Sequence, residues 1–262
     1  MAAPSLDYCS LIAADSAAFA DAVEAGDRDA PVEHCPGWSL LDLARHLWGV
    51  QYFWAEIVAR GLTDPDDVAA LDETPHPPDD ELIAALRPNS EWLVEILRAA
   101  DPATPCWTWS TQHNVGFVQR HQVQEAAVHR WDAQNAAGAA QPIESAAALD
   151  AIEEFLTFSV STNPAAAPDP PGEPLGAPLV LRATDATGVA GVPAGFTIAD
   201  GNAPGTVQVS PGVAVTPAGA RIVEDTASDV LLWLYQRVAL TPTGPESAKD
   251  VVSRFRAVCW TD

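Results

Sequence analysis

The chain has 262 residues, of which 36 are acidic and 13 are basic, so its formal net charge is −23. This charge repels the phosphates of nucleic acids and anionic membrane surfaces, and it argues against partners of both kinds. Hydrophobic residues make up 48% of the chain, which is enough for the core of one large domain or two smaller ones.

The sequence contains none of the segments that direct a chain into or across a membrane. No window approaches the roughly eighteen consecutive apolar residues that a membrane-spanning helix needs. The first residues lack a basic stretch followed by an apolar run, so no export signal is indicated. Four cysteines without C-x-x-C spacing are typical of free thiols in a reducing compartment. We therefore expect a cytoplasmic protein.

The first half of the sequence carries four helical patterns. Hydrophobic residues at helical spacing predict helices over residues 4–26, 39–61, 79–100 and 115–137. Ser39 is expected to cap the second helix, because Asp42 follows it by three residues. Residues 62–78 are acidic and proline-rich and predict a loop, and Pro88 is expected to kink or interrupt the third helix. Four such helices with mostly short connections predict a four-helix bundle.

The second half has a different pattern. A helix is predicted over residues 144–160, followed by an exposed proline-rich connector over residues 163–172. Strands are predicted over 179–183, 195–198 and 206–209, and helices over 226–238 and 246–258. The sequence therefore predicts an α+β protein with two domains. A helical bundle would occupy residues 1–141, and a small α+β domain would occupy residues 142–262.

A carboxylate and a histidine four residues apart occur three times, as Asp42/His46, Asp72/His76 and Glu125/His129. Residues at this spacing lie one above the other on a helix, where they can supply two ligands to a metal ion. Glu125 and His129 fall on a stripe of their helix that also carries Gln122 and Asp132. His46 shares a face with the apolar residues of its own helix and is expected to point into the core.

Two histidines and one glutamate would leave coordination positions open, which suits a catalytic metal site better than a structural one. Zinc is the first choice, and nickel, cobalt and iron also suit this ligand set. The metal would activate a bound water or thiol. Asp132, one turn after His129, is a candidate for orienting an imidazole. The alternative is that Glu125 and His129 form only an exposed ion pair and that Asp132 is an exposed carboxylate.

Several motifs together resemble the mycothiol-dependent maleylpyruvate isomerase family. They are Cys35-Pro-Gly-Trp-Ser-Leu-Leu-Asp-Leu-Ala-Arg-His-Leu47, the stretch from Arg120 to Ala133, Ala183-Thr-Asp185 and Thr226-Ala-Ser-Asp-Val-Leu-Leu-Trp-Leu-Tyr-Gln-Arg237. They occur in the expected order over nearly the whole chain. The chain departs from the family pattern at His121, Gln124 and Phe196, which leaves the metal-binding positions intact.

The resemblance implies a DinB-like four-helix bundle that binds a divalent metal, followed by a small sterol-carrier-like domain. His46, Glu125 and His129 match the metal ligands of the family. The metal would activate the thiol of mycothiol for addition or transfer to a small electrophile, so the enzyme would be an S-transferase or, as in the family's isomerases, would isomerise a cis double bond. Arg237, or in second place Arg221, would bind the carboxylate of the substrate. The alternative for Arg237 is an exposed cation at a helix end.

Other residues receive simpler interpretations. We assign Trp107, Trp109 and Arg120 to binding of the thiol cofactor, and Trp38, Trp48, Trp54 and Trp131 to the core or to pocket walls. His34, His76 and His113 are expected to be solvated in loops, and nothing near Cys35 in sequence marks it as a nucleophile. Two rival functions stay open. They are a hydrolase that uses metal-bound hydroxide, and a non-enzymatic protein that binds a metal or a hydrophobic ligand.

Overall fold

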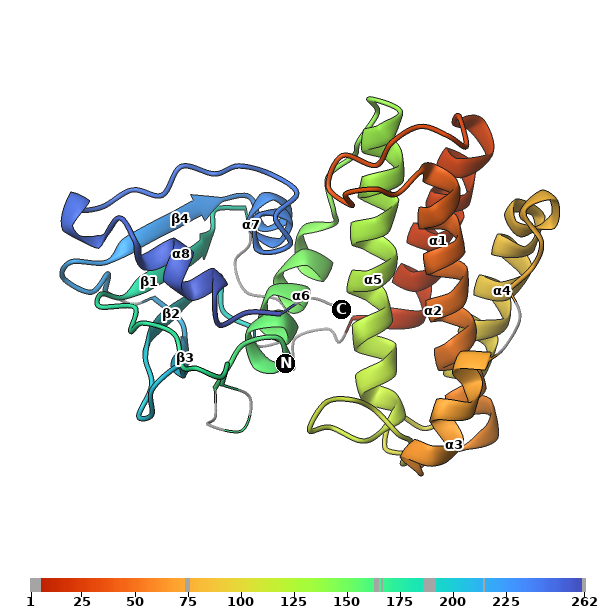
Figure 1. The fold of residues 1–262 in the computed structure, drawn as a ribbon, viewed down its shortest axis with the longest axis horizontal. Helices are drawn as coiled ribbons and strands as arrows, with labels where there is room; N and C mark the ends of the chain where they lie inside the picture. Colours follow the sequence, from red (N-terminus) through yellow and green to blue (C-terminus); the bar gives the residue numbers. More distant parts are fainter. Residues whose placement is uncertain are drawn as a thin grey trace. The chain divides into compact units, whose positions relative to one another are not determined.

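The computed structural model describes residues 6–73, 76–162, 165, 167–185, 192–213 and 215–260, without the side chains of residues 72 and 73. The chain divides into two compact units (Figure 1). The first unit is Asp7–Ile143, and the second contains Glu144–Asp262. None of the helices in the described part of the chain has both the length and the apolar character needed to cross a membrane.

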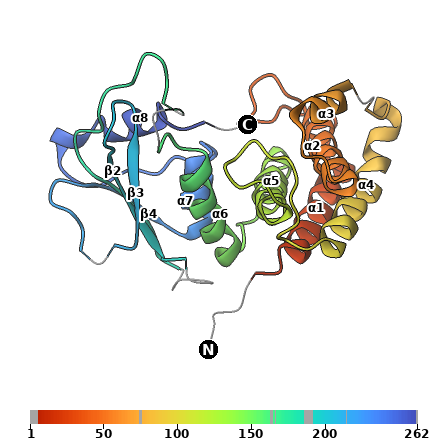
Figure 2. The ribbon, with the colours of Figure 1, turned by 90° about the horizontal axis from the view of Figure 1, so that it is seen from below.

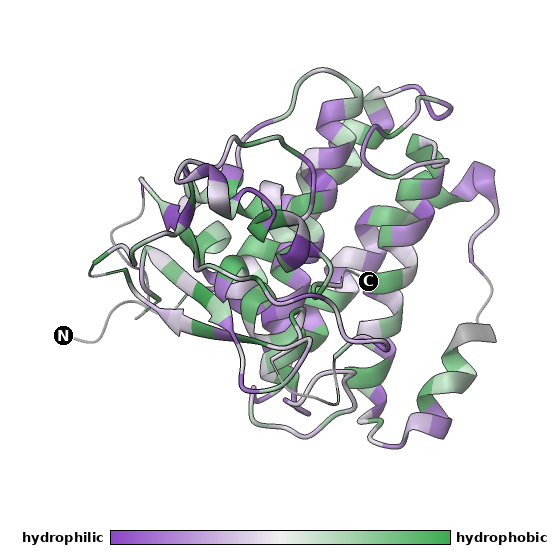
Figure 3. Cartoon of the chain, turned by 60° about the vertical axis from the view of Figure 1, so that its left-hand side comes forward, coloured by the Kyte–Doolittle hydropathy of each residue, from purple (hydrophilic) through white to green (hydrophobic). Residues whose placement is uncertain are grey.

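The first unit is the predicted four-helix bundle. Its helices are α1 (Tyr8–Ala25), α2 (Leu40–Arg60), α3 (Pro65–Ala69), a 3-10 turn η1 (Ala70–Glu73), α4 (Asp79–Ala99) and α5 (Val115–Ala136). Both α1 and α2 pack against α4 and against α5, so the four long helices form a closed ring around the core. Figure 2 shows α5 nearly end-on beside α1. Hydrophobic and hydrophilic residues alternate along the helical ribbons in Figure 3, as expected for amphipathic helices.

The predicted start of the second long helix is confirmed. The Ser39 side chain accepts a hydrogen bond from the backbone of Asp42, and the Asp42 carboxylate accepts one from the backbone of Ser39. This reciprocal capping box satisfies two backbone donors at the start of α2. Asn114 caps α5 in a similar way, because its side chain accepts a hydrogen bond from the backbone of Phe117 at 3.1 Å. These caps fix where the two helices that carry the candidate site begin.

Two predictions for this unit are wrong in part. Residues 62–78 are not all loop, because α3 and η1 lie within them. The Asp64 side chain caps α3, and Pro65 occupies its first position, where a missing backbone N–H has no cost. Helix α4 is not interrupted at Pro88 but continues to Ala99, and the alternative of a kink at Pro88 stays a prediction. Packing against α1 and α2 holds α4 together across the proline, which local sequence rules do not take into account.

A buried arginine ties α5 to α1 and to the segment after α5. The Arg130 guanidinium donates hydrogen bonds to the Asp15 carboxylate at 2.7 Å and to the Gln134 side chain at 2.8 Å. It also donates to the backbone carbonyls of Gln141 and Pro142, at 3.1 and 3.2 Å. Only 5% of Arg130 is exposed to solvent. Buried charge of this kind is tolerated because its donors are matched by acceptors.

The second unit is a small α+β domain, as predicted. Its elements are α6 (Ser145–Phe158), β1 (Leu179–Ala183), β2 (Gly195–Asp200), β3 (Val207–Pro211), β4 (Arg221–Asp225), α7 (Ala227–Leu234), a 3-10 turn η2 (Glu246–Ala248) and α8 (Val251–Arg256). The sheet has the strand order β3-β2-β1-β4, with β4 parallel to β1 and the other pairs antiparallel. Helices α6 and α7 pack against each other. Residues 163, 164 and 166 of the predicted connector lie outside the described residues.

Strand β4 is absent from the predicted elements. Its sequence, Arg221-Ile-Val-Glu-Asp225, has only two adjacent apolar residues and no clear alternation. The strand is held instead by its parallel pairing with β1, whose residues Leu179, Val180 and Leu181 are almost fully buried. The pairing with β1 therefore stabilises β4, although its own sequence has only a weak strand pattern.

Candidate metal centre

Three side chains from two helices meet inside the first unit. His46 comes from α2, and Glu125 and His129 come from successive turns of α5. The Nε2 atom of His46 lies 3.0 Å from Oε1 of Glu125, and Nε2 of His129 lies 3.3 Å from the same oxygen. One ligand atom from each residue lies within 4.8 Å of the others. The two imidazole rings stand edge to face, with centroids 4.8 Å apart.

The packing of α2 on α5 brings the three residues together. His46 meets Glu125, while Trp54 of the same helix meets Phe117, with ring centroids 6.2 Å apart. Residues later in α2 thus pair with residues earlier in α5, so the two helices run antiparallel. The i,i+4 spacing places Glu125 and His129 on one face of α5, and that face is turned toward α2. In the other two carboxylate–histidine pairs, Asp42 caps α2 and the Asp72 side chain lies outside the described residues.

Asp132 contacts the side of the His129 ring that faces away from Glu125 and His46. Its Oδ2 atom lies 3.0 Å from Nδ1 of His129, and the residue is only 1% exposed, which excludes an exposed carboxylate at this position. When the neutral His129 imidazole donates a hydrogen bond from Nδ1–H to Asp132, its Nε2 atom keeps a lone pair and faces Glu125 and His46. Carboxylate–histidine pairs of this type orient metal-binding imidazoles. The donor set of two imidazole nitrogens and a carboxylate oxygen therefore fits a divalent metal such as zinc.

Cys35 is a member of this constellation that sequence reasoning missed. Its Sγ atom donates to Oδ2 of Asp132 over 3.9 Å, so the thiol lies behind the carboxylate that holds His129. Cys35 stands 97 positions from Asp132 in the chain. Only its place at the start of the motif that leads to His46 offered a signal in the sequence.

Burial and charge act on the cluster in opposite directions. Burial would raise the pKa of Glu125, but the His129 and His46 imidazoles outweigh it and hold that pKa well below its usual range. Burial would likewise lower the pKa of His129, but the Glu125 carboxylate and the hydrogen bond to Asp132 raise it to about 9. Without a metal, the site is thus an ion pair between a glutamate and a protonated histidine.

This ion pair predicts how metal affinity depends on pH. A metal binds the neutral imidazole, so below the His129 pKa of about 9 it must displace one proton. We expect the affinity for zinc to rise about tenfold for each pH unit up to about pH 9, and to level off above it. Titrations of the apoprotein with zinc in non-chelating buffers measure this slope. An affinity that does not change between about pH 7 and pH 9 would contradict the assigned protonation of His129.

The two tryptophans assigned to cofactor binding lie against the same two helices. Trp107 stacks on Trp54 with centroids 6.2 Å apart and meets Phe53 edge-on at 6.1 Å. Trp109 meets Phe117 edge-on at 5.2 Å. Both indoles therefore pack against aromatic side chains of α2 and α5, the two helices that carry the metal cluster. They are packed among other rings, and both are half-buried.

Arg120 lies on the same helix as Glu125 and His129, and its assignment to the thiol cofactor stays a prediction. It lies five residues before Glu125 on α5, which rotates it by about 140° around the helix axis. The residue is half-buried on that different side of α5. Arg237, the predicted substrate-binding arginine, belongs to the second unit and is half-buried after α7, where its guanidinium donates to the Tyr235 carbonyl at 2.8 Å.

A cavity of about 300 Å³ opens beside His46. It is lined by His46, Trp48, Gly49, Val50, Tyr52, Phe53, Leu71 and His76. His46 belongs both to the lining of this cavity and to the metal cluster, and Phe53 lines the cavity and also contacts Trp107. Its walls combine aromatic rings with polar imidazole groups, a mixture that suits a small organic molecule with polar substituents.

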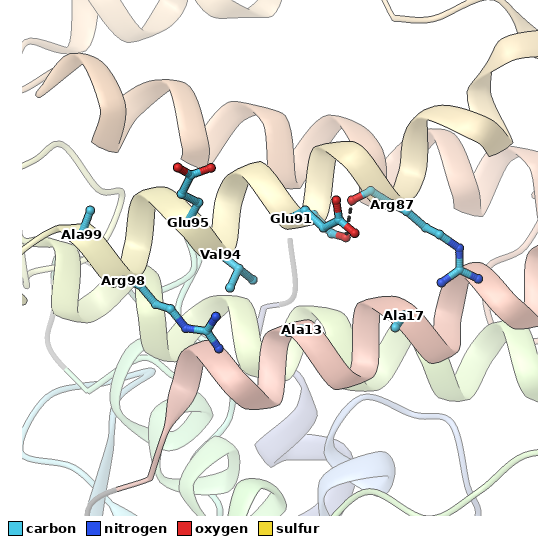
Figure 4. Close-up of a pocket in the computed structure, with 9 residues that line it drawn as sticks. Ala13, Ala17, Arg87, Glu91, Val94, Glu95, Arg98 and Ala99 are labelled. Carbon is cyan, nitrogen blue, oxygen red and sulfur yellow. Dashed lines mark hydrogen bonds between the residues drawn. The ribbon is translucent and has the colours of Figure 1, made fainter.

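A larger cavity of about 640 Å³ lies between α1 and α4 (Figure 4). Ala13 and Ala17 of α1 and Val94 of α4 form its apolar part, and Arg87 and Arg98 stand toward its two ends. Arg87 is already paired with acidic residues of α1. No residue of the metal cluster lines this cavity, so we place the chemistry beside His46 despite the smaller volume there.

The comparison with known families decides the affiliation of the bundle. Residues 9–134 match the family model described as the mycothiol maleylpyruvate isomerase N-terminal domain, and the match includes all three residues of the cluster. Residues 9–134 are therefore a domain of the mycothiol maleylpyruvate isomerase family. The resemblance drawn from the sequence motifs is therefore confirmed. No curated protein sequence gives a significant match to the chain.

Solved structures extend the similarity beyond the maleylpyruvate isomerase N-terminal domain. The crystal structure of the mycothiol-dependent maleylpyruvate isomerase matches with a TM-score of 0.55 and 12% sequence identity. The match covers 90% of this chain and 92% of that chain. The structure of a mutant of that enzyme, with one histidine replaced by alanine, gives the same values. At this identity the similarity concerns the fold, and it covers most of both units.

Proposed function

We propose that this protein is a metal-dependent enzyme that uses a low-molecular-weight thiol, mycothiol, to act on a small carboxylate-bearing electrophile. The observation that carries the proposal is the cluster of His46, Glu125 and His129 inside a domain of the maleylpyruvate isomerase family. Zinc is the proposed metal because two imidazoles and a carboxylate are ligands that it accepts with a position left open. We place the reaction in the cytoplasm, where thiols stay reduced.

The side chains of the cluster have distinct roles in this proposal. A divalent metal, when bound, supplies the Lewis acidity that brings the pKa of a thiol toward neutrality. His46, Glu125 and His129 hold the metal. Asp132 accepts a hydrogen bond from Nδ1–H of His129 and so fixes the orientation of that ring.

The proposed reaction is a cis–trans isomerisation. The thiolate sulfur adds to one carbon of the cis double bond, and the π electrons move onto the conjugated carbonyl group. Rotation then takes place around the resulting single bond. Return of the electrons breaks the carbon–sulfur bond and releases the trans isomer and the thiolate. No proton or oxidant is consumed overall.

We propose that Arg237 binds a carboxylate of the substrate, with Arg221 as the second candidate. Arg237 follows α7 in the second unit and is half-buried. Arg221 lies on β4, and its guanidinium donates to the Gly244 carbonyl at 3.1 Å. A guanidinium can bind a carboxylate through two parallel hydrogen bonds, which fixes the orientation of the substrate.

The thiol requirement tests this function directly. We expect zinc-loaded protein to isomerise maleylpyruvate, the first substrate to test, only when mycothiol is present, with turnover at least about a hundredfold above the thiol-free rate. The absorbance change of the substrate measures the reaction, and the metal-free protein with mycothiol is the control. Turnover that is unaffected by omission of the thiol would overturn the thiol mechanism and favour a hydrolase that uses metal-bound hydroxide.

A further inference from the structure

A histidine from the segment before α4 rests directly on the backbone of α2. A Cβ atom added to Gly49 would lie 2.8 Å from Cε1 of His76 and within 3.7 Å of both ring nitrogens. The His76 ring also contacts Trp48, with centroids 5.4 Å apart. Gly49 lies inside α2, where glycine is less favourable than alanine. The contact with His76 accounts for this glycine, because a larger residue would displace the imidazole.

His76 faces the cavity that His46 joins to the metal cluster. Both histidines line this cavity, and Gly49 lies one helical turn after His46 on α2. His76 itself is not one of the clustered ligand atoms, which in the described residues come only from His46, Glu125 and His129. A role for His76 at the metal centre would therefore pass through a molecule bound in the cavity.

Among the side chains that line the cavity, His76 is an exposed imidazole that can meet an anion. No lysine or arginine is found among the described lining residues. The Tyr52 hydroxyl is committed to Glu56, since burial and this neighbouring carboxylate, to which it is hydrogen-bonded, raise the pKa of Tyr52. Within the described part of the chain, no hydrogen bond engages the nitrogens of His76, and the residue is exposed to solvent. An imidazole in this state can donate to a ligand.

We propose that His76, seated on Gly49, receives a carboxylate of the small electrophilic substrate in the cavity beside His46. The net charge of −23 opposes the approach of an anion, so a local donor is needed to bind it. This inference rests on the proposed function, and it assigns a substrate-binding residue to the first unit. His76 is therefore a specificity-determining residue, and Gly49 is a positioning residue that provides its seat.

Binding of maleate, a small dicarboxylate probe, to the zinc-loaded protein tests the assignment by calorimetry. We expect His76→Ala and Gly49→Ala each to weaken maleate binding at least about tenfold, with one zinc per chain retained. If Gly49→Ala acts by displacing His76, the double variant binds maleate no more weakly than His76→Ala alone. His113→Ala, which removes another exposed histidine of the same unit, is the matched control and should bind maleate like the wild type.

The outcomes separate this inference from the function on which it rests. Failure of the wild type to bind zinc would remove the proposed function. Zinc binding without maleate binding in the wild type would overturn the carboxylate site alone, and so would unchanged maleate binding by His76→Ala. A double variant much weaker than His76→Ala would show that Gly49 acts independently and would overturn its role as the seat. Loss of maleate binding in His113→Ala as well would contradict the specific assignment to His76.

Discussion

Replacement of Glu125 by glutamine is expected to lower the affinity for zinc by more than about a hundredfold, beyond the loss typical of groups that only support a ligand. Oε1 of Glu125 lies 3.0 Å from His46 and 3.3 Å from His129, so the carboxylate is the centre of the cluster. Glutamine keeps the shape of the side chain but removes the negative charge that attracts a cation. Thiol-dependent activity should be lost with the metal.

Metal content per chain after dialysis, together with competition against a zinc chelator, measures this effect. Glu91→Gln is the matched control, because Glu91 is an exposed residue of α4 outside the cluster and its replacement should leave zinc affinity unchanged. Circular dichroism of both variants distinguishes loss of a ligand from loss of fold. Zinc affinity in Glu125→Gln that equals that of the wild type would rule out the proposed metal centre.

The largest effect on stability is expected from Arg130→Ala. Removing this buried guanidinium takes away the ion pair that the Asp15 carboxylate makes at 2.7 Å and the hydrogen bonds to the Gln141 and Pro142 carbonyls. Breaking a buried ion pair from one side typically costs about 3–5 kcal/mol in the free energy of unfolding. That cost is a large fraction of the stability of an ordinary domain.

Urea denaturation of the metal-free protein, followed by circular dichroism, measures the change. Arg87→Ala is the control, because Arg87 pairs with Asp21 and Glu24 on the surface, where ion pairs contribute little. The double variant Asp15→Ala/Arg130→Met should recover part of the loss, since it removes both charges and replaces the guanidinium with an apolar side chain. Equal losses in Arg130→Ala and Arg87→Ala would contradict the structural role assigned to Arg130.

Features encoded within a few residues of the sequence were predictable. The capping box of Ser39 and Asp42 fixed the start of α2, and the i,i+4 spacing of Glu125 and His129 indicated a shared helix face. Both depend on neighbours in sequence, so local rules apply to them. The inward direction of His46 also followed from the apolar residues on its helix face.

Features created by contacts between distant residues were not predictable from sequence. His76, in the segment before α4, contacts Gly49 of α2, whereas the sequence around His76 suggested only a solvated loop. The contact of Cys35 with Asp132 spans 97 positions, and Arg130 reaches Asp15 across 115. In each case the partner is selected by helix packing, which the periodicity of a single helix does not specify.

The placement of the ligands on α2 and α5 also determines when a metal can be taken up during folding. His46 and Glu125 are separated by 79 positions, so they meet only after the chain between them has been ordered. Of the three proposed ligands, only Glu125 and His129 are close in sequence, and this pair needs a formed helix to align. The bundle must therefore fold before it can bind a metal through all three residues. Under the proposed function, metal supply would then set the fraction of active molecules.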